Sequence, residues 1–365
     1  MNKYAAGGAL VLAGVLALTA CGRDPEAGGG SDQAPSASAA DCAEGSLNAS
    51  GSSAQANAMT EWVKAYQASC SGATINYQSN GSGAGVEQFI QGNTGFAGSD
   101  SALKEDETPK ATERCEGNTP INLPMVVGPI SVVYKLEGVD NLQLSPETLA
   151  KIFANKVKKW NDPAIKKDNP DATLPATPIQ TFHRSDSSGT TDNFTKYLSS
   201  AASKDWTFEN DKVWKAPGGQ GSKGSEGIAS SLKDTEGAIS YVELSYAENS
   251  ELSQAKVKNA AGEFVELTGE SAAATVASAK VVGSGNDLAL EIDYNTKAAE
   301  AYPIVLVTYE ITCEKGLPAD QVDLVKGFLT YASSQKGQDS LSDLGYAPLP
   351  DEVAGKVRQA VKAIA

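Results

Sequence analysis

Three short segments rich in serine and glycine most constrain how this chain can fold. Each precedes a stretch with helical spacing of apolar residues: Ser50-Gly51-Ser52-Ser53, Ser79-Asn80-Gly81-Ser82-Gly83 and Ser187-Ser188-Gly189-Thr190. Such turns present backbone N–H groups and hydroxyls at the positive end of a helix dipole, which suits an anion. Together with Arg184 and the acid of Gly98-Ser99-Asp100, they predict a cage for an oxyanion.

Strands and helices alternate along the chain. Apolar runs predict strands that include residues 125–127, 130–134, 179–182 and 304–307, and helices follow the serine-rich turns. Repeated strand–turn–helix units predict an α/β fold with largely parallel sheets. Ligands of such sheets bind at the carboxyl ends of strands, where helix N-termini converge, and the three turns occupy such positions.

The N-terminus predicts export. Lys3 precedes an apolar run over 9–18, which is too short for a comfortable membrane span and typical of a signal-peptide core. The following Leu18-Thr19-Ala20-Cys21 resembles the lipobox of bacterial lipoproteins, which implies a signal peptide over 1–20 and lipidation of Cys21. An ordinary secretory signal with an incidental cysteine is the alternative. Residues 22–41 lack an apolar period, so we expect 21–41 to be the lipidated cysteine and a flexible tether.

Four cysteines remain in the exported part, and an even number there favours two disulfides. Cys42 and Cys70 each precede an apparent strand, and parallel neighbouring strands would bring these starts together. We therefore favour Cys42–Cys70 and, by elimination, Cys115–Cys313. Free buried thiols or a metal site are the alternatives, and a single histidine without any Cys-x-x-Cys argues against zinc.

The net charge of −15 argues against binding to nucleic acid or to anionic lipid. It does not exclude an anionic ligand, because short hydrogen bonds in a dehydrated cleft outweigh a surface field that is screened over roughly 8–10 Å.

A Ser-His-Asp hydrolase is the competing enzyme interpretation, because His183 lies near Ser188 and Asp186. Strand alternation points His183 and Arg184 to opposite faces, and the Gly-x-Ser-x-Gly elbow is missing. The segment 219–224 fits Gly-x-Gly-x-x-Gly, but Pro217 precedes it and no apolar strand leads into it. We interpret it as a glycine-rich loop before a helix that contains Ile228.

Six segments in order resemble the phosphate-binding lipoproteins and periplasmic proteins that serve ABC-type phosphate importers: residues 76–82, 98–100, 158–162, 184–190, 237–243 and 344–350. The resemblance implies a two-lobed, type II-like periplasmic-binding-protein fold of class α/β, with two hinge crossings and a ligand cleft between the lobes. One lobe would comprise 42–128 plus 303–365, and the other 129–302.

The resemblance also assigns the phosphate ligands. They would be the Ser53 hydroxyl, the Ala54 N–H, Ser82, Asp100, Arg184, Ser188, Gly189 and Thr190, with Asp186 holding the arginine through a salt bridge. The aromatic residue that the family usually has at position 54 is absent. Asp100 would accept the proton of hydrogen phosphate, so sulfate, which has no proton at neutral pH, would leave this acid unpaired against like charge.

The predicted function is high-affinity phosphate binding outside the cytoplasmic membrane and delivery to an ABC permease with its ATPase subunits. We expect a monomer that is lipid-anchored on the extracytoplasmic face of the cell membrane, has no cofactor or metal, and is no enzyme. The alternatives are a binding protein for another oxyanion or an organic anion, or a secreted phosphatase.

Overall fold

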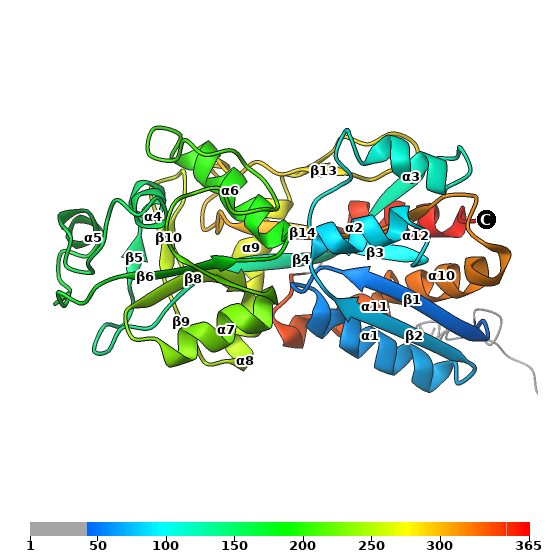
Figure 1. The fold of residues 1–365 in the computed structure, drawn as a ribbon, viewed down its shortest axis with the longest axis horizontal. Coiled ribbons are helices and arrows are strands. Elements are labelled where there is room, and N and C mark those ends of the chain that lie inside the picture. The colour runs from blue at the N-terminus through cyan, green and yellow to red at the C-terminus, as the bar shows by residue number, and fades with distance from the viewer. Residues whose placement is uncertain (1–41, 348) are drawn as a thin grey trace, which may run out of the picture. The chain divides into compact units, whose positions relative to one another are not determined.

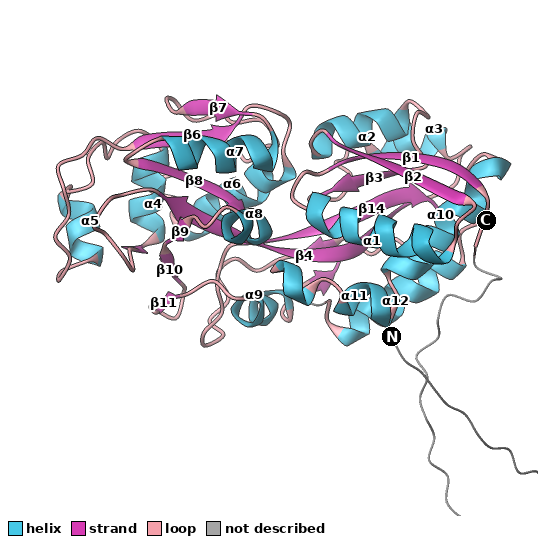
Figure 2. Ribbon diagram, turned by 90° about the horizontal axis from the view of Figure 1, so that it is seen from below, coloured by secondary structure: helices cyan, strands magenta, loops and turns pink. Residues whose placement is uncertain are grey.

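A nine-stranded mixed sheet runs through the part of the chain that the computed structural model describes, residues 42–347 and 349–365. The sheet has the strand order β2-β1-β3-β14-β4-β8-β6-β7, and β9 pairs with β4. Figures 1 and 2 show two groups of strands with helices packed on them, joined by β4 and β14. The predicted signal peptide, Cys21 and tether lie outside the described residues.

The first group of strands, β1 to β3, is parallel. Strand β1 (Gly45–Gly51) lies between β2 (Ala73–Ser79) and β3 (Phe96–Ser99). Helix α1 (Ala56–Ser69) connects β1 to β2, and α2 (Ser82–Ile90) connects β2 to β3. Helix α1 starts just after the first serine-rich turn and α2 starts within the second, so both helices lie where the sequence predicts them.

The second group of strands is also parallel. Strand β6 (Gln180–Arg184) lies between β8 (Ala238–Glu243) and the short β7 (Gln220–Ser222). Helix α6 (Gly189–Ala201) follows β6, and α7 (Gly224–Asp234) follows β7. The segment interpreted as a glycine-rich loop is thus partly an edge strand, and the predicted helix around Ile228 is α7.

The centre of the sheet is antiparallel, which differs from the expectation of largely parallel sheets. Strand β4 (Pro120–Tyr134) is buried along its whole length and pairs antiparallel first with β14 (Val305–Cys313) and then with β8. The segments 125–127 and 130–134 are therefore one strand. Because β4 and β14 pass between the two groups in opposite directions, they cannot pair in parallel.

The other elements cover the edges and faces of this sheet. They are α3 (Thr108–Arg114), β5 (Gln143–Leu144), α4 (Pro146–Phe153), α5 (Pro163–Asp168), α8 (Leu244–Asn249), β9 (Ser253–Gln254), β10 (Lys256–Lys258), β11 (Phe264–Val265), α9 (Gly269–Val276), β12 (Lys280–Val281), β13 (Leu290–Glu291), α10 (Ala319–Ala332), α11 (Gln335–Asp339), η2 (Ser342–Leu344) and α12 (Asp351–Lys362). No helix in the described ranges is long and apolar enough to span a membrane.

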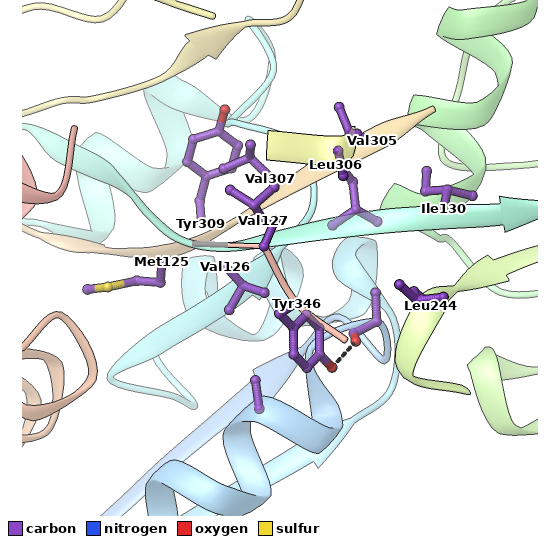
Figure 3. Close-up of a cluster of buried hydrophobic side chains, with 14 of the residues drawn as sticks. Met125, Val126, Val127, Ile130, Leu244, Val305, Leu306, Val307, Tyr309 and Tyr346 are labelled. Atoms are coloured by element: carbon purple, nitrogen blue, oxygen red, sulfur yellow. Dashed lines mark hydrogen bonds between the residues drawn. The ribbon is translucent and has the colours of Figure 1, made fainter. Parts of the chain in front are cut away.

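Apolar side chains pack on both faces of β4 and β14, as expected for strands buried between layers of other elements. Val127, Val305 and Leu306 are at most 1% exposed and belong to the cluster in Figure 3. Tyr346 packs below the strands there, and its hydroxyl donates a hydrogen bond of 2.7 Å to the Ala54 carbonyl. The C-terminal part of the chain therefore supports the first serine-rich turn.

Two disulfides are present within the described residues, in the pairing that the sequence favours. Cys42–Cys70 joins Cα atoms 5.2 Å apart, and Cys115–Cys313 joins Cα atoms 5.4 Å apart. The first forms for the expected reason, because β1 and β2 are parallel neighbours with Gly45 opposite Ala73. The second ties the end of α3 to the end of β14 across 198 residues of sequence.

Candidate functional site

The turn after β1 brings Ser53 and Ala54 to the carboxyl end of the sheet. Gly51 and Gly98 approach so closely that a Cβ on Gly51 would overlap the Gly98 carbonyl. The Ala54 N–H donates to Ser52 Oγ at 3.0 Å, which closes the turn. Ser53 Oγ lies 3.0 Å from Ser225 Oγ and accepts the Ser225 N–H at 3.1 Å, so this turn contacts the start of α7.

Ser82 and Asp100 contact each other beside the turn that follows β1. Ser82 is the first residue of α2 and is fully buried, and its Oγ donates to Asp100 Oδ2 at 3.2 Å. Asp100 follows β3, and its other oxygen accepts a 2.8 Å bond from Thr308 Oγ1 on β14. The Gly189 N–H donates to Ser82 Oγ at 3.1 Å, which places the start of α6 against both residues.

Arg184 ends β6 and is held in one orientation by Asp186. Arg184 Nε and Nη2 donate to the two oxygens of Asp186 at 2.8 and 2.5 Å. The side chain of Arg184 is 2% exposed, so the pair is largely shielded from water. Asp186 Oδ1 also accepts the Gly224 N–H at 3.0 Å. The ion pair predicted from the sequence is thus present, and its two bonds use Nε and Nη2 but not Nη1.

The third serine-rich turn begins α6. Ser188 is its N-cap, with Oγ accepting the Thr191 N–H at 3.3 Å, so its own hydroxyl hydrogen is free to donate elsewhere. A Cβ on Gly189 would overlap Asp100, and only glycine allows this approach. Thr190 Oγ1 lies 3.5 Å from Asp100 Oδ2.

These contacts link all the predicted ligands into one ring. Ser53 contacts Ser225 next to Gly224, Gly224 contacts the Arg184–Asp186 pair, and a Cβ on Gly81 would lie 2.5 Å from Asp186 Oδ2. Ser82 Oγ contacts both Asp100 Oδ2 and the N–H of Gly189 at the start of α6, which closes the ring. The residues of the ring are buried, apart from the partly exposed Asp186 and Gly224.

The two carboxylates of the ring are held differently. Burial raises the pKa of Asp100, although bonds from Ser52 and Thr308 and the charge of Arg184 oppose the rise. Burial acts in the same direction on Asp186, but the hydrogen bonds and charge of Arg184 outweigh it, so the pKa of Asp186 is lowered. Asp186 is therefore the fixed partner of the arginine, while the oxygens of Asp100 accept hydrogen bonds from the hydroxyls of Ser82 and Thr308.

The ring combines hydroxyl and N–H donors, one guanidinium and one acceptor carboxylate, which suits a small oxyanion that carries a proton. His183 does not join it, because its ring stacks on Trp214 with centroids 5.0 Å apart. A Ser-His-Asp arrangement is therefore not formed. No group of three or more potential metal-ligating side chains occurs within residues 42–347 and 349–365.

Comparison with known proteins agrees with this geometry. A family model described as the PBP superfamily domain matches residues 36–336. Phosphate-binding protein PstS 3 of Mycobacterium tuberculosis (strain ATCC 25618 / H37Rv) is 44% identical over 371 residues, covering 100% of both chains. Phosphate-binding protein PstS of Pasteurella multocida (strain Pm70) is 35% identical and covers 82% of this chain and 84% of that protein. The chain belongs to the PstS family within the PBP superfamily.

Solved structures show the same fold. A high-affinity periplasmic phosphate-binding protein bound with phosphate superposes with a TM-score of 0.71 at 21% identity, covering 86% of this chain and 93% of that one. A phosphate-binding protein from Stenotrophomonas maltophilia gives a TM-score of 0.68 at 19% identity, with the same coverage. The family and the two-lobed periplasmic-binding-protein fold predicted from the resemblance are thus confirmed.

The structure of this PstS-family chain also adds residues that the sequence analysis missed. Gly224 and Ser225 at the start of α7 contact Asp186 and Ser53, and Thr308 donates to Asp100. The sequence does contain a signal for the role of α7, because 221–225 is a fourth segment rich in glycine and serine, and a helix starts within it. For Thr308 the only signal is a polar residue within the apolar run of β14.

Proposed function

We propose that this protein binds inorganic phosphate outside the cytoplasmic membrane and delivers it to an ABC-type phosphate permease. The observation that carries the proposal is the buried ring, in which donors from four helix starts surround one arginine and one acceptor carboxylate. The names of the relatives, which are phosphate-binding proteins, support this choice of ligand.

Each residue of the ring has a chemical role toward hydrogen phosphate. The hydroxyls of Ser53, Ser82, Ser188 and Thr190 and the N–H groups of Ala54 and Gly189 would donate to its oxygens, and those that contact one another or Asp100 in the structure would exchange these contacts for the ligand. Arg184, oriented by Asp186, supplies a charge-assisted donor. Asp100 accepts the ligand's proton. Sulfate offers no such proton, so its negative oxygen would face a carboxylate in a dehydrated site, and specificity follows from this repulsion.

Binding would close two lobes, which we place at 42–128 plus 303–365 and at 129–302. The boundaries fall within β4 and just before β14, the two connections between the strand groups. Ser53, Ser82 and Asp100 then belong to one lobe, and Arg184 to Thr190 belong to the other. Phosphate bound to both would stabilise the closed state through its higher affinity for that state. A permease with its ATPase subunits would recognise this closed form.

We further propose that Cys21 is lipidated and anchors a monomeric protein on the extracytoplasmic face of the cell membrane. In this role the protein needs no cofactor and performs no catalysis. Phosphate is captured and released unchanged.

Titration calorimetry on a protein that starts at Gly22 tests the ligand directly. We expect tight 1:1 binding of phosphate, weaker competition by arsenate and no measurable heat with sulfate. A chromogenic phosphate ester should release product only at the background rate. Sulfate binding as tight as phosphate binding, or steady turnover of the ester, would contradict the proposal.

A further inference from the structure

Glu310 is a buried carboxyl group that the proposed phosphate site does not use. It lies in the middle of β14 and is 0% exposed. Neither of its carboxyl oxygens has a hydrogen-bond partner among the described residues. Buried acids are normally paired or hydrogen-bonded, because an isolated buried charge is costly. The exception at Glu310 therefore needs a physical explanation.

The strand register places Glu310 directly behind the site. Glu310 lies opposite Gly98 in the antiparallel pair of β14 and β3, and Asp100 is two residues beyond Gly98. Thr308, two residues before Glu310 and on the same face, donates to Asp100. The backbones of Glu310 and Asp100 are thus diagonal neighbours, about 7–8 Å apart, and both side chains project from the same face.

Because Gly98 has no side chain, the side chains of Gln55 and Tyr77 fit beside it. Their hydrogen bonds connect this region to the first serine-rich turn of the site. A Cβ on Gly98 would overlap Gln55 Nε2 and would lie 2.5 Å from the Tyr77 hydroxyl. Gln55 Nε2 donates to Tyr77 at 3.0 Å, and Tyr77 donates to the Ser52 carbonyl at 2.8 Å. Gln55 Oε1 also has no partner among the described residues.

The unpartnered atoms at this place are all acceptors: both oxygens of Glu310 and Oε1 of Gln55. A single proton on Glu310 provides the missing donor and removes the uncompensated charge. We propose that Glu310 is a positioning residue that carries a proton when phosphate is bound, and that its ionisation weakens phosphate binding. This inference rests on the proposed function.

The surroundings set the direction of the effect. Burial raises the pKa of Glu310 to about 8; the Gln55 side chain lies close enough to oppose the rise without forming a well-aligned hydrogen bond, and the charge of Asp100 adds to the rise. Tyr77 faces Glu310 from β2, and β4 places the apolar Leu123 opposite it. With this pKa the carboxyl is mainly neutral well below pH 8. Above pH 8 it becomes a second negative charge behind Asp100, next to a dianionic ligand.

Bound phosphate should in turn hold the proton on Glu310, because linkage is reciprocal. Phosphate binding near pH 8.5 should therefore take up protons from the buffer, at a pH where phosphate itself is already almost entirely dianionic.

The first test compares the phosphate Kd of the wild-type protein and of Glu310→Gln from about pH 6.5 to 9.5. The ionisation of phosphate changes both Kd values by the same factor at each pH, so their ratio does not depend on it. We expect a ratio near one at the acidic end and a wild-type protein that is roughly 5- to 10-fold weaker than Glu310→Gln at the alkaline end. Glu352→Gln, at an exposed ion pair on α12, is the matched control and should follow the wild type. A ratio that stays within twofold throughout would overturn the inference.

The second test uses the wild-type protein alone and remains decisive if Glu310→Gln does not fold. Calorimetry near pH 8.5 in buffers of different ionisation enthalpy should show uptake of a fraction of a proton per phosphate bound. Phosphate binding without uptake would refute the role of Glu310 and leave the proposed function intact. A wild-type protein that fails to bind phosphate at any pH would overturn both.

Discussion

Replacing Lys212 by methionine is expected to weaken phosphate binding, although Lys212 is not a ligand in the proposed site. Two ion pairs join the loop after β3 to the loop between α6 and β7. Lys212 Nζ lies 3.2 Å from Glu107 Oε1, and Lys104 Nζ lies 3.0 Å from Asp211 Oδ1. The Lys212 carbonyl also accepts the N–H of Ser188 at 2.8 Å. The pairs therefore join the two proposed lobes next to the ring.

The burial of the first pair sets the size of the expected effect. The side chains of Lys212 and Glu107 are 3% and 18% exposed. Breaking a fully buried pair costs about 3–5 kcal/mol, and breaking an exposed one about 0–1 kcal/mol. Glu107 keeps some contact with water, and both groups regain hydration when the lobes separate. We therefore expect Lys212→Met to cost the closed state about 1–2 kcal/mol, a rise in Kd of roughly 5- to 30-fold.

Calorimetric titration with phosphate measures this effect, and circular dichroism checks that the variant is folded. Lys64→Met is the matched control, because Lys64 pairs with Glu61 at 3.3 Å on the exposed surface of α1. The control should bind phosphate like the wild type. A folded Lys212→Met protein with a Kd within twofold of the wild type would refute the view that this ion pair supports closure.

Two further predictions concern the arginine of the ring and the anchor. Arg184→Ala removes the main positive charge and leaves Asp186 without its partner, so phosphate binding measured by calorimetry should weaken by about 2–4 kcal/mol; a smaller loss than 1 kcal/mol would argue against Arg184 as a ligand. Cys21→Ala should release the protein or leave its signal uncleaved, as seen by membrane fractionation, while phosphate affinity stays unchanged; a cleaved variant that remains on the membrane would disprove lipidation of Cys21.

Local patterns in the sequence predicted much of the fold. The serine-rich turns preceded α1, α2 and α6, and the parallel arrangement of β1 and β2 explained why Cys42 pairs with Cys70. The continuity of β4 could not be predicted, because Gly128-Pro129 inside it signals a turn. The structure shows why Pro129 is tolerated there. It lies where the pairing of β4 passes from β14 to β8.

The resemblance to the phosphate-binding family predicted which residues would form the ring, but not what lies behind it. Thr308 and Glu310 alternate with apolar residues on β14, a pattern equally typical of a strand with one face in water. Only the sheet order, with β14 between β3 and β4, shows that this face is buried against Asp100. The contact of Ser225 with Ser53 depends in the same way on elements that are 172 residues apart.

The selection of phosphate by Asp100 is the central claim, and titration of Asp100→Asn with phosphate and sulfate at one salt concentration tests it most directly. Asparagine preserves the shape of the side chain but adds a donor where the aspartate only accepts. We predict that phosphate binding weakens by about 1–3 kcal/mol and that sulfate becomes a measurable ligand. An Asp100→Asn protein that still rejects sulfate as strongly as the wild type does would contradict the account.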